Sequence, residues 1–132
     1  MAGTIAADTL THSTAGSLTT DYVVNGSAKA WVNFTGTGTI AVNDSLNIAS
    51  LTDDGTGIYR VNMGSAFVSV NHSPVGSNIN DSSTANRGTV TVAASGSASS
   101  TSSVIAFAVY SVSAGNYLDG TDVNVQAHGD LA

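Results

Sequence analysis

The chain has 132 residues, enough for one domain with one hydrophobic core, and it carries a formal net charge of −6 with only three basic residues. A nucleic-acid partner requires a basic footprint and an anionic membrane attracts basic residues, so we expect neither as a partner. Only 9% of the residues are charged, against about 25% in typical domains. Val, Ile and Thr, which suit pleated strands, are abundant, whereas strong helix formers are scarce. This composition predicts an all-β fold.

The sequence contains no cysteine, so it predicts neither disulfides nor thiolate metal sites. The first residues lack a positive n-region and a continuous apolar h-region, so we expect synthesis in a host cytoplasm without a signal peptide. The abundance of Ser, Thr, Asn and Gly is nevertheless typical of extracellular surfaces. That combination favours a virion, released by lysis; a secreted protein whose leader was removed by cloning is the alternative.

The N-terminal half predicts an arm followed by strands. Residues 1–20 predict an extended N-terminal arm with a short strand near Thr4–Thr11, and residues 21–132 predict a β-sandwich domain. The stretch "DYVVN" at 21–25 predicts a strand that ends at the turn pair Asn25-Gly26. Residues 28–34 alternate: small and apolar side chains point to one face, and the other face carries Lys29, Trp31 and Asn33.

The rest of the chain predicts further short strands joined by polar turns. Residues 45–63 predict a hairpin with its turn at Asp53-Asp54-Gly55, and residues 66–71 predict another strand. Residues 72–88, with the only proline, predict a long loop. Strands follow at 89–95, at 104–112 (apolar on both faces and therefore central) and at 122–128. About eight strands of this kind predict a single-domain antiparallel β-sandwich or jelly roll.

The residues that could support chemistry do not form a recognised motif. His12, His72 and His128 have no local metal-ligand spacing. The segments at 53–55 and 119–122 fit β-turns better than calcium loops, and no G-x-S-x-G elbow is present. We therefore expect no enzyme activity, no catalytic, cofactor-binding or metal residues, and no cofactor.

One segment is similar to a known class of proteins. Residues 26–63 contain the strand "KAWVNF", the turn "GTGT" and the hairpin "LTDDGTGIYRVNM". This segment resembles one found in virion-surface proteins of marine and cyanobacterial bacteriophages, of the tail-fibre and capsid-decoration type. The resemblance implies a structural role in the virion and supplies no catalytic residues.

Together these features predict a capsid decoration (cement) protein that forms a homo-oligomer, a trimer, and stabilises the phage head by binding the major capsid protein. The alternatives are a tail-fibre or receptor-binding domain that recognises host-surface glycan with the 72–88 loop, and a surface carbohydrate-binding module. Trp31, with Lys29 and Asn33, is the candidate interface. A core tryptophan and a sugar-stacking platform are the other interpretations of Trp31.

Overall fold

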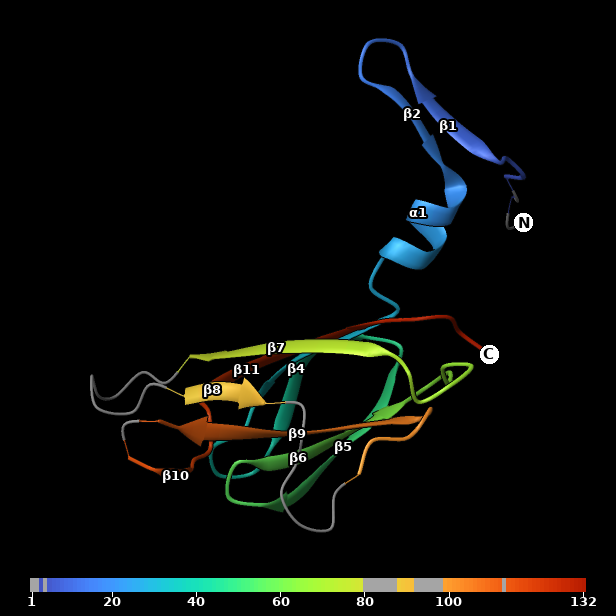
Figure 1. Ribbon diagram of the computed structural model, residues 1–132. Coiled ribbons are helices and arrows are strands. Elements are labelled where there is room, and N and C mark those ends of the chain that lie inside the picture. Colours follow the sequence, from blue (N-terminus) through green and yellow to red (C-terminus); the bar gives the residue numbers. More distant parts are fainter. Residues whose placement is uncertain (1–2, 4, 80–87, 92–98, 113) are drawn as a thin grey trace.

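The protein is a sandwich of two β-sheets with an N-terminal segment that projects from it (Figure 1). The computed structural model describes residues 3, 5–79, 88–91, 99–112 and 114–132. Antiparallel pairing joins all the strands, and the only helix among the described residues has seven residues. The predicted all-β sandwich is confirmed.

The first sheet has four strands in the order β4-β3-β11-β7. They are β3 (Ala30–Thr35), β4 (Ala41–Leu46), β7 (Ser73–Ile79) and β11 (Asp122–His128). β3 and β4 form a hairpin around the Gly-Thr-Gly-Thr turn, as predicted, whereas β11 comes from the far end of the chain and pairs with β3 and β7. The register aligns Trp31 with Gln126, and Gln126 with Val75.

The second sheet has five strands, and β9 (Val104–Ser111) pairs with three of the others. β5 (Ile48–Gly55) and β6 (Ile58–Met63) form the predicted hairpin, although its turn lies at Thr56 and Gly57, after Asp53-Asp54-Gly55. β6 continues the sheet to β9, and β8 (Gly88–Thr91) and β10 (Asn116–Tyr117) flank the end of β9.

The core lies between the two sheets and is built from alternate residues of four strands. β3 and β11 contribute one layer, and β6 and β9 contribute the other. At its centre, Phe34 packs edge-on against Tyr59 and Phe107, with ring centroids 5.1 and 5.9 Å away. The predicted inward face of residues 28–34 is confirmed. The predicted burial of the 104–112 strand is confirmed for residues 105–109, whereas Val112 is 70% exposed.

The chain passes from one sheet to the other at Asn47, which has a φ of 58°. Its side-chain oxygen accepts a hydrogen bond from the Ser65 N–H at 2.6 Å, and its side-chain nitrogen lies 3.1 Å from the carbonyl oxygens of Lys29 and Ser65. Asn tolerates the left-handed region better than most residues. Asn47 thus fixes the corner where β4 ends and β5 begins.

The prediction of a strand at 21–25 is wrong. Thr20–Gly26 form the helix α1, with Asp21 in the first turn and no buried residue. Figure 1 shows that α1 stands away from both sheets, with no described strand running alongside it. An acid near the N-terminus and the Lys29 ammonium at the last turn both favour a helix here.

The predictions for residues 66–71 and for the 72–88 loop are also wrong in part. Phe67 makes only a single bridge with Leu131, because the backbone of this stretch bonds to two separate segments, at Ser102 and Asp130. Ser73–Ile79 form β7, which covers the open edge of β11. β7 ends the sheet, and an edge strand tolerates Pro74. Residues 80–87 and 92–98 lie outside the described residues.

The N-terminal segment stands away from the sandwich (Figure 1). The expected arm contains a hairpin of β1 (Thr9–His12) and β2 (Gly16–Thr19), which leads directly into α1. Every described residue of β1 and β2 is exposed. The hairpin is joined to the sandwich only through α1 and the short link before β3.

Candidate functional site

Two of the three candidate interface residues, Trp31 and Asn33, lie on β3, whereas Lys29 precedes this strand. Trp31 and Asn33 lie on the outer face of the four-stranded sheet, as their alternation predicted. Lys29 instead donates to the Val24 carbonyl oxygen and to Ser27 Oγ, so it ties the end of α1 to the sandwich. Trp31 is half-buried and lies outside the core of this chain.

A row of side chains crosses the outer face at the level of Trp31. The register places Leu46 beside it on β4, Gln126 beside it on β11, and Val75 beyond Gln126 on β7. Residues directly opposite each other in antiparallel strands share a face. Sequence analysis could not find Gln126 or Val75, because nothing local indicates that β11 inserts between β3 and β7.

A second row, one step along the strands, is a network of amides and one carboxylate. Asn43 Nδ2 donates to Asn33 Oδ1 at 2.7 Å, and Asn33 Nδ2 lies 2.8 Å from Asn124 Oδ1 and 2.5 Å from Asp122 Oδ1. Asn124 Nδ2 also donates to Asp122 Oδ1, at 3.2 Å. These bonds fix the orientation of the Asn33 and Asn124 side chains.

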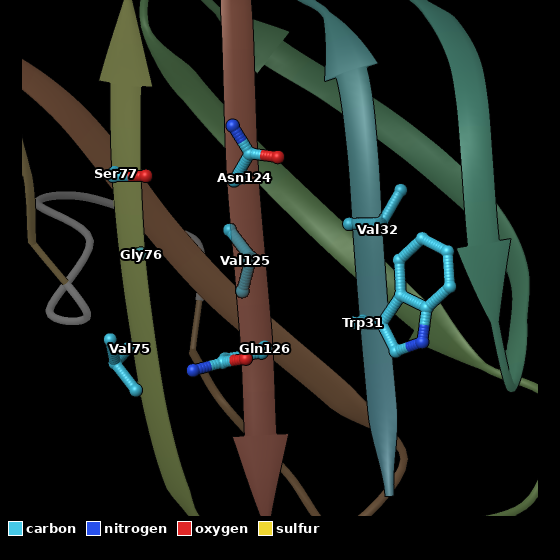
Figure 2. A pocket seen from close by; sticks show the side chains of 8 residues that line it. All are labelled: Trp31, Val32, Val75, Gly76, Ser77, Asn124, Val125 and Gln126. Carbon is cyan, nitrogen blue, oxygen red and sulfur yellow. The ribbon is translucent and has the colours of Figure 1, made fainter. Parts of the chain in front are cut away.

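Between these rows the surface is hollowed into an open groove of about 320 Å³. Figure 2 shows its lining on three neighbouring strands, with the indole ring of Trp31 seen broadside. We call this surface the Trp31 groove; it is lined by Trp31, Val32, Val75, Gly76, Ser77, Asn124, Val125 and Gln126. None of these residues carries a charge, so the groove offers an aromatic face, amides and a hydroxyl group.

The two aspartate segments that could be read as calcium loops have protein partners. Asp54 forms an ion pair with Arg60 at 2.5 Å, and the hydrogen bond from Arg60 lowers the pKa of the Asp54 carboxyl group. Asp119 Oδ1 accepts hydrogen bonds from the Gly57 N–H at 2.6 Å and from the Tyr59 hydroxyl at 2.9 Å. In the part of the chain that the structure describes, no three His or Asp side chains gather as a metal site.

Tyr59 and Asp119 close one end of the sandwich. The Tyr59 hydroxyl lies between Asp119 Oδ1 and the Gly36 carbonyl oxygen, which is 3.1 Å away. Burial, and then the hydrogen bond to Asp119, raise the pKa of Tyr59. A Cβ atom at Gly36 would lie 2.5 Å from the Tyr59 hydroxyl oxygen, so this position in the Gly-Thr-Gly-Thr turn has no room for a side chain.

The three histidines serve separate local structures. His12 Nδ1 accepts the N–H of Ala15 in the β1–β2 turn, and His128 ends β11. His72 packs its ring edge-to-face on Phe67 at 4.8 Å, and burial lowers its pKa. Among the described residues, neither ring nitrogen of His72 has a hydrogen-bond partner.

Comparisons with protein-family models, curated proteins and solved structures found no match. Among the described residues, no helix combines the length and the apolar character needed to cross a membrane. The fold and the site therefore define the class by themselves: an all-β sandwich with an aromatic and amide groove on one outer face and a projecting apolar segment at its N-terminus.

Proposed function

We propose that the protein is a structural, non-enzymatic component of a bacteriophage virion, a capsid decoration (cement) protein. The observation that carries this proposal is the projecting N-terminal segment, residues 9–26 (Figure 1), because its large apolar side chains are well exposed in the part of the chain that the structure describes. Decoration proteins act through contact area with their neighbours. A segment that reaches out and is apolar suits that role.

The apolar side chains of this segment are well exposed. Leu10 and Leu18 lie opposite each other in the β1–β2 hairpin and are 46% and 43% exposed. On α1, Tyr22 is 70% and Val24 is 58% exposed. Exposed apolar groups that gather on a surface mark interaction sites in soluble proteins. The exposure of these four side chains on one projecting segment supports binding to a neighbouring subunit.

The partners that we propose are further copies of this chain, in a trimer, and the major capsid protein. The net charge of −6 argues against a packaged nucleic acid as the partner. The location that follows is the outside of the virion. Residues 9–26 would bind the neighbouring subunits, and the sandwich would form the rest of the protein. The resemblance of residues 26–63 to phage virion-surface proteins supports the same role.

The alternative is a tail-fibre or receptor-binding domain that contacts host glycan. The Trp31 groove favours glycan contact, whereas the expected binding loop at 72–88 is taken up in part by β7. Copy number separates the two roles. A decoration protein covers the head in numbers comparable with the major capsid protein, and a fibre protein is present in few copies.

Quantitative mass spectrometry of purified virions, with the major capsid protein as internal standard, tests the proposal. We expect near-stoichiometric amounts of the chain. Particles that lack it should be reloaded by purified wild-type protein and by Thr9→Asp, a charge on the opposite side of the hairpin, but poorly by Leu10→Asp. A few copies per particle, or equal loading of both variants, would contradict the proposal.

A further inference from the structure

We propose that the Trp31 groove is a binding site for a neutral oligosaccharide. Trp31 would stack against one sugar ring, and the side chains of Gln126, Asn124 and Ser77 would hydrogen-bond to hydroxyl groups of the neighbouring sugar units. The inference rests on the outer face of the four-stranded sheet alone. The inference does not depend on whether the protein is part of a virion.

The first argument is the position of the indole ring. Figure 2 shows the ring broadside, on the side of β3 that faces away from β11. The face of an indole ring is electron-rich, and the C–H groups on one side of a pyranose ring form an apolar, slightly positive surface that complements it. The Trp31 indole N–H has no hydrogen-bond partner in the part of the chain that the structure describes, so it is available as a donor.

Free polar groups on the two neighbouring strands, β11 and β7, supply the second argument. Gln126 adjoins Trp31 in the register and is exposed, and its amide makes no hydrogen bond to any described residue. Ser77 is exposed and equally free. An amide supplies both donors and an acceptor, and a hydroxyl supplies one of each kind, which are the groups that sugar hydroxyls require.

The third argument is that part of the site is already ordered. Asn33 and Asp122 hold the Asn124 side chain through hydrogen bonds of 2.8 and 3.2 Å. All the lining residues lie on strands of one sheet. A site on rigid strands loses little conformational entropy when a ligand binds.

The chemistry of the groove selects this ligand over others. Its lining has no cation for a phosphate or an acidic peptide and no anion for a basic one. Its volume of about 320 Å³ is at the lower end of small-molecule sites, about 300–1,000 Å³. Among the described residues in register with Trp31, Leu46 beside it and Val75 beyond Gln126 are exposed apolar side chains. This face is less apolar than residues 9–26 and therefore suits a second protein less well.

Tryptophan fluorescence offers a direct test, because Trp31 is the only tryptophan of the chain. The isolated full-length protein would be titrated with a panel of neutral oligomers of glucose, galactose, mannose and N-acetylglucosamine, with heparin as an anionic comparison. We expect a saturable change in emission with at least one neutral oligomer and none with heparin. No change with any neutral oligomer, up to the solubility of each, would overturn the proposal.

Variants then assign the response to the groove. Gln126→Ala removes a free amide and should weaken binding about 2- to 10-fold, the effect of one hydrogen bond. Asn116→Ala, an exposed amide on β10, should bind as the wild type does. Trp31→Ala should abolish the heat of binding in calorimetry, while circular dichroism verifies its fold. Equal affinity of Gln126→Ala and wild type, or an emission that changes with protein concentration without sugar, would overturn the proposal; the second result would mark this face as a contact between copies.

Discussion

At the scale of single residues, a polar side chain at Asn47 determines how the two sheets are joined. Its backbone takes a positive φ, and its side chain reaches backbone groups on both sides of the crossover, at Lys29 and Ser65. Sequence analysis placed Asn47 inside an alternating strand. Its role depends on contacts with residues 18 positions away in either direction, which no local pattern reveals.

Two substitutions at this corner should separate its side-chain bonds from its backbone conformation. Asn47→Gly keeps the freedom to adopt a positive φ but loses three side-chain hydrogen bonds. Asn47→Ala loses the same bonds and adds a strain of about 1–2 kcal/mol. We expect urea unfolding to show both variants destabilised by more than about 1 kcal/mol, with Ala the worse. A Gly variant that is less stable than the Ala variant would show that the conformation is not the constraint.

Tyr59 should make stability depend on pH in the alkaline range. Its pKa in the folded protein is raised, so the folded state keeps the hydroxyl proton above pH 10 while the unfolded chain releases it. The contribution of Tyr59 to the free energy of unfolding should therefore be fully present below about pH 10 and decrease as the pH rises further. Urea unfolding between pH 8 and 11 should show this decline in the wild type. It should be weaker in Tyr59→Phe and unchanged in Tyr22→Phe, a control at an exposed tyrosine.

At the scale of elements, the strands that sequence patterns predicted best are those that bury one complete face. β3, β6 and β11 alternate between buried and partly buried residues, and β9 is buried throughout its middle. β7 was missed because Pro74 and Gly76 disfavour a strand, and only the neighbouring β11 makes it one. α1 was missed because its Tyr-Val-Val run favours strands, and burial could not correct this since the helix buries nothing.

Some residues of the candidate site could be predicted from the sequence and others could not. Alternation along one strand was enough to place Trp31 and Asn33 together on an outer face. Gln126, Asn124 and Ser77 join them only because of the strand order, which depends on pairing between distant segments. Lys29 was assigned to the same face, but the carbonyl groups at the end of α1 provide a hydrogen-bonding partner that the strand pattern does not show.

A charge inside β9 should unfold the protein. Phe107 is fully buried and packs against Phe34 and Tyr59, so Phe107→Asp places a carboxylate where no partner is available. The cost of several kcal/mol is comparable with the whole stability of a domain, about 5–15 kcal/mol. Val112→Asp, just beyond β9 and 70% exposed, is the matched control. Circular dichroism should show loss of the native signal only for Phe107→Asp, and a folded Phe107→Asp variant would contradict this assignment of the core.

The N-terminal segment should be the least protected part of the isolated protein. Two-stranded hairpins are marginal in water, and residues 9–26 gain almost no burial from the sandwich. Hydrogen exchange should be fast there in the free chain and slow once the chain is bound to particles, while β9 is protected in both. Slow exchange at residues 9–26 in a monomer would mean that the segment is stabilised without a partner.

At the scale of the whole molecule, stability should depend on apolar burial and strand pairing and not on bound metal. The carboxylates at 53–54 and 119–122 that could bind a cation are already engaged with Arg60, Tyr59 or backbone and amide N–H groups. We expect EDTA to leave the melting temperature and the urea midpoint unchanged. A large fall in either that added calcium reverses would contradict this and direct attention to those aspartates.

The pairing of β3 with β11 has a consequence for how the protein is made. Asn33 and Asn124 meet side by side although 91 positions separate them in the chain. At about 5–20 residues per second, a ribosome makes these strands roughly 5–20 seconds apart. During that interval β3 lacks its partner β11, so one edge of β3 is unpaired. Unpaired apolar strands promote aggregation. Slow translation should therefore lower the soluble yield, and chaperones that hold nascent chains should raise it.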